Sequence, residues 1–200
     1  MVRFLTLLLC GLCLLSQAGF AQDEEAAKQR AQSVRERVDA FTAEFGDNQK
    51  QHFYAIYGAY NVASVVRMVQ KDVGNAVQKC GAENPQIKGD MTARHKVWKS
   101  EIDAVLKEAD ANIDNMILAQ AYAQPKDIRG LFKFLDETRE AKNKEINKVP
   151  VTDLEACQYL LGKMDETQAQ LTGLLRETLV SLPKALQDAQ MQEEQKALDE

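Results

Sequence analysis

A regular apolar stripe between Thr152 and Leu182 is the feature that most constrains the fold of this chain. Its members recur at spacings of three or four residues: Leu154, Cys157, Leu161, Met164, Gln168, Leu171, Leu175, Leu179 and Leu182. This period places the side chains on one face of an α-helix, whereas a β-strand has a period of two. Pro150 ends the preceding segment, and Thr152 with Glu155 has the form of a capping box. The stretch predicts a long helix that buries one face.

Such a stripe serves either an intermolecular coiled coil or an internal helix of a bundle. We favour the bundle because four further segments carry matching stripes, at residues 22–45, 49–80, 90–123 and 125–148. The last of these weakens after Leu135 into a charged stretch. The predicted fold class is all-α: an antiparallel up-and-down bundle of four to five long helices with coiled-coil-like packing and one disulfide. The heptad pattern also leaves homo-oligomerisation open.

Turn-forming residues separate these segments. Gly46 and Gly81 are expected to end the first two helices, because glycine readily adopts the left-handed C-cap conformation. Asp90 is expected to be the N-cap of the third helix, and Pro125 fits the first turn of the fourth.

The N-terminus has the pattern of a secretory signal peptide. Arg3 precedes an apolar run from Phe4 to Leu15, and small residues follow up to Ala21. We expect cleavage after Ala21 and a periplasmic or secreted location. The predicted organisation is a signal at residues 1–21, a helical bundle domain at 22–182 and an acidic, Gln-rich tail at 183–200. No membrane span is expected after cleavage.

Cleavage would remove Cys10 and Cys13 and leave Cys80 and Cys157. In an up-and-down bundle, Cys80 near the end of the second helix and Cys157 near the start of the fifth lie at the same end. An oxidising compartment then favours an intramolecular disulfide between them. Two free thiols or an intermolecular pair are the alternatives.

An aromatic segment in the second helix is the candidate interaction surface. Five of its residues form the possible partner or ligand face: Phe53, Tyr54, Tyr57, Tyr60 and Asn61. Tyrosine offers a large apolar ring and a hydroxyl, as binding surfaces often require. The same pattern would arise in a bundle helix that is contacted on two sides, with Gly58 and Ala59 allowing close approach, and we favour this structural interpretation.

The residue patterns of common cofactor and metal sites are missing. No CxxCH motif is present, and His52 and His95 fall near opposite ends of their helices, which disfavours haem. The segment from Asp110 to Asp114 resembles the start of a calcium loop, but Asn115 stands where that loop requires glycine. We therefore expect no catalytic residue, no metal ligand and no cofactor.

Composition narrows the function further. The net charge is −5, from 25 basic and 30 acidic residues, so the composition does not indicate the positively charged surface that binds nucleic acid. We expect a non-enzymatic periplasmic or secreted protein that acts by binding another protein or as a structural accessory factor. The alternative is a carrier of a small ligand, a metal or haem in a cavity between helices near Tyr54, Tyr57 and Tyr60.

Overall fold

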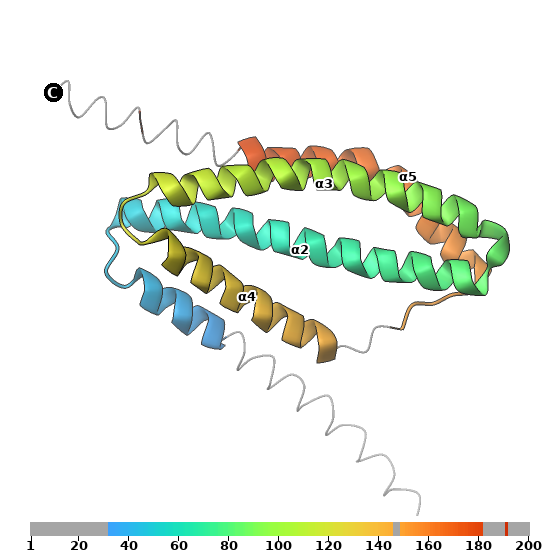
Figure 1. Ribbon diagram of the computed structural model, residues 1–200, viewed down its shortest axis with the longest axis horizontal. Coiled ribbons are helices and arrows are strands. Elements are labelled where there is room, and N and C mark those ends of the chain that lie inside the picture. Colours follow the sequence, from blue (N-terminus) through green and yellow to red (C-terminus); the bar gives the residue numbers. More distant parts are fainter. Residues whose placement is uncertain (1–31, 146–148, 182–190, 192–200) are drawn as a thin grey trace, which may run out of the picture. The chain divides into compact units, whose positions relative to one another are not determined.

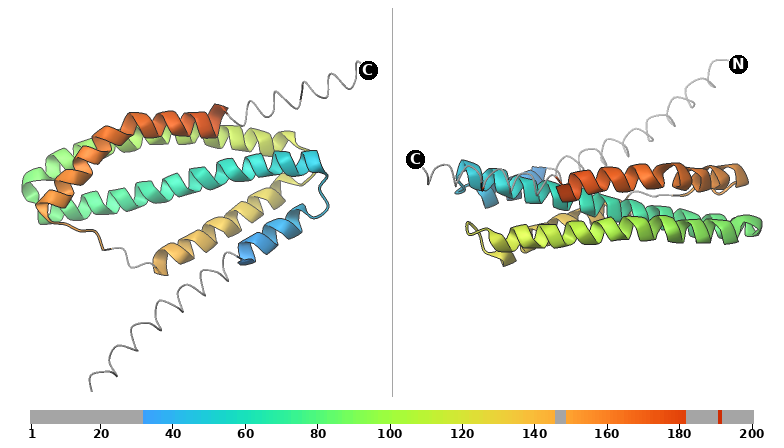
Figure 2. Two further views of the ribbon diagram at one scale, coloured as in Figure 1. Left: turned by 180° about the vertical axis from the view of Figure 1, so that it is seen from behind. Right: turned by 90° about the horizontal axis from the view of Figure 1, so that it is seen from above.

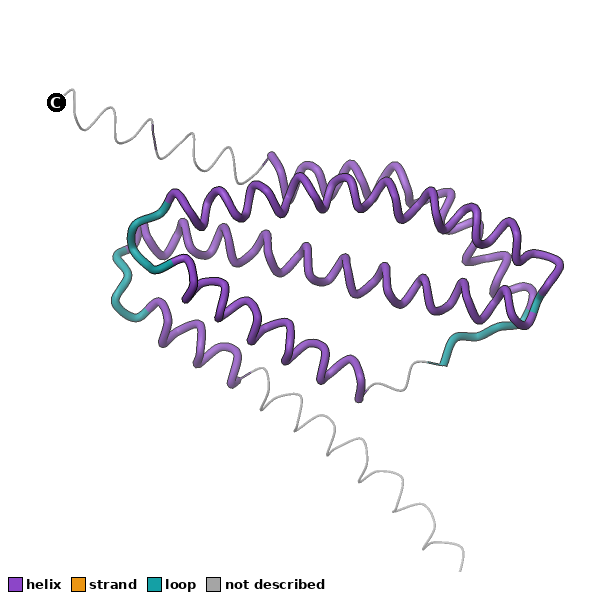
Figure 3. The backbone as a smooth tube through the Cα atoms, viewed as in Figure 1, coloured by secondary structure: helices purple, strands orange, loops and turns teal. Residues whose placement is uncertain are grey.

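The computed structural model describes residues 32–145, 149–181 and 191 (Figure 1). Among these residues there are helices and short connections but no strand (Figure 3). A helix covers residues 32–42, and the others are α2 (Asp47–Glu83), the 3-10 turn η1 (Pro85–Ile87), α3 (Lys88–Ala119), α4 (Pro125–Glu145), α5 (Leu154–Arg176) and the π-helical segment η2 (Glu177–Ser181). The predicted all-α helical bundle is confirmed.

The described residues form two compact units. Unit 1 contains residues 32–44 and 133–145, and unit 2 contains residues 45–132 and 149–181, so that α4 passes from one unit into the other. The predicted signal at 1–21, its cleavage after Ala21 and nearly all of the predicted tail at 183–200 lie outside the described residues. A single bundle domain over residues 22–182 stays a prediction.

Unit 2 is built on an antiparallel pair of helices, α2 and α3 (Figure 1). Arg67 of α2 pairs with Asp110 of α3, and one turn along Gln70 donates to Asp103 at 3.1 Å. Residue numbers rise along α2 while those of the paired residues fall along α3, so the two helices run antiparallel. Helix α5 lies along α3 in the same direction, with Arg94 near Asp165 and Arg176 3.5 Å from Glu108 (Figure 2).

The core of unit 2 consists of one apolar face from each of its helices. The largest completely buried side chains of this unit come from α2, α3, α4, α5 and η2: Phe53, Ile56, Cys80, Met91, Ile102, Val105, Ile117, Ile128, Cys157 and Leu179. Burying one large apolar side chain stabilises a fold by roughly 1.5–3 kcal/mol. Packing of these faces, more than helix propensity, therefore holds the helices together.

Arg94 explains the one polar residue in the α5 stripe. Its guanidinium donates to the side-chain oxygen of Gln168 and, at 2.7 Å, to the backbone oxygen of Met164. It also pairs with the carboxylate of Asp165. Gln168 therefore faces α3, where it contributes a hydrogen bond in place of an apolar contact.

The predicted disulfide joins the end of α2 to the start of α5. Cys80 and Cys157 are bonded, with an S–S length of 2.00 Å and Cα atoms 5.7 Å apart. The buried Asn84 lies beside the bond, and its Nδ2 donates to the backbone oxygens of Thr152 at 2.8 Å and Cys80 at 3.2 Å. This end of unit 2 is thus held by a covalent bond and by a buried amide.

Four predicted helix boundaries are wrong. The first helix ends at Thr42, and Gly46 is the N-cap of α2 with a φ of −68°. Gly81 does not end α2, which continues to Glu83, and among the described residues no glycine has a positive φ. The ring of Pro85 starts the η1 turn instead, and α3 follows directly from Lys88 with Ile87 as its N-cap, so Asp90 lies inside the first turn. At α5 the N-cap is Asp153 in place of Thr152.

The reason for the change at α5 is local. The Oδ1 of Asp153 accepts a hydrogen bond of 2.8 Å from the backbone nitrogen of Ala156. Aspartate is at least as good an N-cap as threonine, and its charge also suits the positive end of the helix dipole.

Unit 1 contains the helix at 32–42 and the second half of α4. Val38, Thr42 and Leu135 are buried, and the guanidinium of Arg37 lies 4.9 Å from the ring centre of Phe134. Helix α4 continues to Glu145 although its apolar stripe weakens after Leu135. Ion pairs one turn apart accompany this stretch, Lys133 with Glu137 at 3.8 Å and Lys144 with Glu140 at 3.4 Å, and such pairs add a few tenths of a kcal/mol each.

Candidate functional site

An aromatic cluster surrounds the first turns of α2. Its members come from the start of α2, the residue before its N-cap and the α3–α4 connection: Phe45, His52, Phe53, Tyr54, Tyr57 and Tyr122. Phe45 meets Tyr122 edge-on with ring centres 4.9 Å apart, and Phe53 stacks on Tyr57 at 5.9 Å. Offset and edge-on pairs such as these stabilise a fold beyond the area that they bury.

The five residues of the predicted partner or ligand face lie in different environments. Phe53 is completely buried, whereas Tyr54 is 44% exposed. Tyr57, Tyr60 and Asn61 are half-buried, and the ring of Tyr60 stacks on Phe132 at 4.0 Å between ring centres. Phe53 and Tyr60 therefore pack within unit 2, and Tyr54 is the most exposed of the five.

The contact between His52 and Tyr122 was not predicted from the sequence. The Nδ1 of His52 lies 2.9 Å from the hydroxyl oxygen of Tyr122, across 70 residues of chain. Gln120 shapes the connection that carries Tyr122, because its side chain bonds both the nitrogen and the oxygen of Ala123, at 2.9 and 2.8 Å. No local sequence pattern shows where the α3–α4 connection folds back on α2. Only the residue types, a histidine and a tyrosine, could have suggested that these two side chains meet.

Burial sets the protonation of both groups. Desolvation lowers the pKa of His52, which keeps the imidazole neutral at neutral pH. Burial also raises the pKa of Tyr122 well above its usual value of 10. At neutral pH both rings are uncharged, and the contact between them ties the α3–α4 connection to α2.

Acidification should destabilise the protein partly through His52. Because its folded pKa lies below the usual 6.5, the stabilisation is complete above pH 6.5 and is lost as the pH falls through the folded pKa. One histidine contributes at most about 1.4 kcal/mol per pH unit. Urea unfolding of the wild type and of His52→Gln between pH 7.5 and 5.5 should show a smaller loss of unfolding free energy in the variant.

His95, whose pKa is lowered mainly by burial, contributes to the pH dependence with the same sign, so His95→Gln is the matched comparison. Equal slopes for the wild type and His52→Gln would contradict this assignment.

Three large apolar side chains are exposed along one face of α2. Tyr54, Val65 and Val69 are 44%, 45% and 43% exposed. Their spacings of eleven and four residues correspond to about three turns and one turn, so they share a face. We call these three residues the α2 outer stripe. The aromatic pattern indicated only Tyr54, because valines at helical spacing could equally have belonged to the core.

Other classes of site have little support in the described part of the chain. There, no group of three or more His, Cys, Asp or Glu residues could hold a metal ion. Within the same residues, no helix is both long enough and apolar enough to cross a membrane. Comparisons with protein-family models, with curated proteins and with solved structures found no match to this chain.

Proposed function

We propose that this protein is a non-enzymatic accessory factor of an extracytoplasmic compartment, periplasmic or secreted, that acts by binding another protein. The observation that carries the proposal is the α2 outer stripe, a row of exposed apolar side chains on a helix whose opposite face is buried. A helical face of this kind suits an apolar groove or a second helix on a partner, with large side chains one or more turns apart as anchors.

The character of the stripe supports a protein partner. Exposed apolar residues scattered singly are normal on soluble proteins, whereas a larger exposed apolar patch marks an interaction site. The α2 outer stripe places three such residues on one helix face. Tyrosine is one of the three residue types enriched at the energetic centres of interfaces, and the β-branched side chains of Val65 and Val69 have little rotamer freedom to lose on binding.

Two features support an extracytoplasmic compartment. The apolar run from Phe4 to Leu15 has the length of a signal peptide core. A disulfide between Cys80 and Cys157 is of the kind that persists in oxidising compartments. The proposal therefore includes cleavage after Ala21 and a mature chain that begins at Gln22.

Photocrosslinking in the protein's own cells tests both parts of this proposal. Benzoylphenylalanine in place of Val65 or Val69 should give an adduct of one defined partner. The same crosslinker in place of Lys107, an exposed residue of α3, should give at least tenfold less of that adduct. The wild-type chain purified from the same cells should have the mass of residues 22–200 less two hydrogens.

The variant Tyr54→Ala should weaken the adducts formed at positions 65 and 69, since it removes the largest ring of the stripe. Equal adduct yields at positions 65 and 107 would contradict binding through the stripe. A mass that retains residues 1–21 would contradict the proposed compartment.

A carrier of a small ligand is the second candidate function. Near Tyr54, Tyr57 and Tyr60, where the sequence suggested a cavity, the rings pack on their neighbours, with Tyr54 5.6 Å from Phe53 and Tyr60 4.0 Å from Phe132 between ring centres. A groove in a different part of unit 2 has room for a small ligand.

A further inference from the structure

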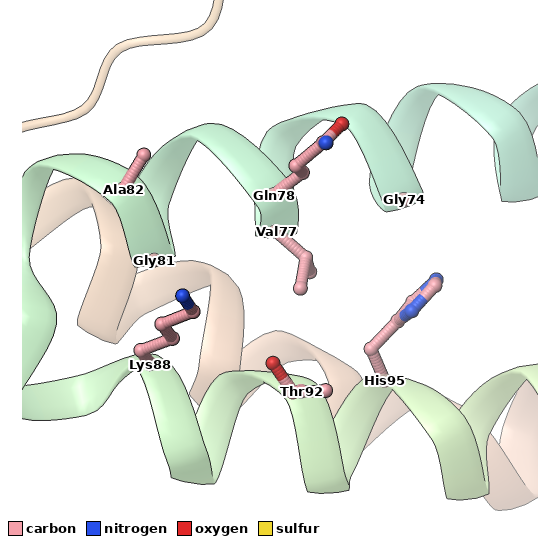
Figure 4. Close-up of a pocket in the computed structure, with 8 residues that line it drawn as sticks. All are labelled: Gly74, Val77, Gln78, Gly81, Ala82, Lys88, Thr92 and His95. Atoms are coloured by element: carbon pink, nitrogen blue, oxygen red, sulfur yellow. The ribbon is translucent and has the colours of Figure 1, made fainter.

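A groove lies between α2 and α3 close to the disulfide end of unit 2. Its volume is about 480 Å³, and its lining consists of Gly74, Val77, Gln78, Gly81, Ala82, Lys88, Thr92 and His95 (Figure 4). Volumes of roughly 300–1,000 Å³ are usual for small-molecule sites. Gln78, Ala82, Lys88 and Thr92 are exposed, so the groove is open to solvent.

Two glycines of α2 create the space. Gly74 and Gly81 are seven residues apart and therefore share the helix face turned toward α3. A Cβ atom on Gly74 would meet the His95 ring at 3.4 Å, and one on Gly81 would meet Cγ of Lys88 at 3.0 Å. Side chains of α3 can therefore extend toward the α2 backbone, as Figure 4 shows for Lys88 and His95.

The polar groups of the lining suit a negatively charged ligand. Lys88 brings a positive charge, Thr92 and Gln78 bring neutral donors, and none of the eight lining residues is acidic. The Nε2 of His95 is buried and has no hydrogen-bond partner among the described residues. A buried ring nitrogen without a partner carries a desolvation cost that a ligand could remove.

The charge state of His95 is consistent with this role. Burial, and secondarily the positive charge of Lys99, lower the pKa of His95. The imidazole is therefore neutral near pH 7 and can donate one proton from a ring nitrogen. An anion bound beside it would favour the protonated ring and raise the pKa of His95 again.

We infer that this groove is a binding site for a small organic anion, whose carboxylate or phosphate group lies between Lys88, Thr92 and His95 and whose apolar part contacts Val77 and Ala82. The inference goes beyond the proposed function, because the groove and the α2 outer stripe consist of different residues. It does not depend on a protein partner.

Three probes that share one ring test the site and its head-group preference: benzoate, phenyl phosphate and the neutral benzyl alcohol. The chain has two histidines, so side-chain NMR signals of His95 can be followed with His52 as an internal control. Benzoate or phenyl phosphate should shift the His95 signals along a saturable curve at constant ionic strength. The tighter of the two identifies a carboxylate or a phosphate as the natural head group.

Two variants locate the binding. Lys88→Gln should weaken anion binding at least tenfold, whereas Lys96→Gln, an exposed lysine of α3 outside the groove, should leave it within twofold. Gly74→Ala adds a methyl group at contact distance from His95 without a severe clash, and alanine favours a helix more than glycine does. This variant should stay folded and should bind the anion at least fivefold more weakly.

Several results would overturn the inference. One is the absence of saturable shifts for both anions up to about 10 mM, roughly tenfold weaker than millimolar binding. Another is binding of benzyl alcohol as tight as that of benzoate, since it would remove the role of charge. A third is an equal affinity of the wild type and Lys88→Gln.

Discussion

Loss of the Cys80–Cys157 disulfide should reduce the free energy of unfolding by about 4 kcal/mol. The bond closes a loop of 77 residues, and in the loop-entropy model a loop of this length restricts the unfolded chain by roughly that amount. The melting temperature should fall by roughly 10 °C, since each kcal/mol corresponds to about 2–4 °C in a domain of this size. Among the described residues, this disulfide is the one covalent cross-link that contributes to the stability of the fold.

The measurement compares urea unfolding of the wild type with and without a phosphine reductant. The double variant Cys80→Ala/Cys157→Ala should match the reduced wild type and should not respond to the reductant. Asn84→Ala is a useful third protein, because it removes the buried amide at the same end but leaves the loop closed. A loss below about 1 kcal/mol on reduction would show that the non-covalent contacts of this end already hold it.

The sequence could predict this bond because it depends on helix direction alone. Five amphipathic segments with short connections imply alternating directions, which bring the end of the second helix beside the start of the fifth. No side-chain detail enters that argument. The errors at Gly81 and Thr152 moved the helix ends by one to three residues and did not change the order of the helices.

The candidate sites were much harder to predict, because each depends on residues far apart in the chain. The groove requires that Gly74 and Gly81 face Lys88 and His95, which follows from the register between α2 and α3. A shift of the register by one residue would replace those neighbours, and nothing in a single sequence reports it. Arg94 shows the same difficulty: its role becomes visible only when Gln168 lies opposite.

The aromatic segment of α2 shows where periodicity stops being informative. Phe53 and Tyr54 are neighbours with similar side chains, and both belong to the segment singled out as a partner or ligand face. One is completely buried and the other is 44% exposed. Apolar residues that cover more than one face of a helix do not show which face a neighbouring element will cover, so the two could not be separated before the packing was known.

Phe53→Ala should therefore lower the free energy of unfolding by about 3–5 kcal/mol, the usual cost of removing a fully buried aromatic ring. The ring lies between Phe45, Tyr54 and Tyr57, and its removal leaves a cavity among their edges and faces. Tyr54→Ala should cost about 1 kcal/mol or less, because its ring is 44% exposed and meets the rings of Phe53 and Tyr57 edge-on.

The variants Phe53→Ala and Tyr54→Ala also distinguish an effect on stability from an effect on partner binding. At a growth temperature where both variants remain folded in the cell, Tyr54→Ala should weaken the crosslinked complex, whereas Phe53→Ala should retain it despite the larger loss of stability. Unfolding curves for the two variants and adduct yields at position 65 provide both quantities from the same proteins. Equal losses of stability would contradict the assignment of Phe53 to the core, and loss of the adduct in Phe53→Ala alone would move the partner surface from the α2 outer stripe to the aromatic cluster.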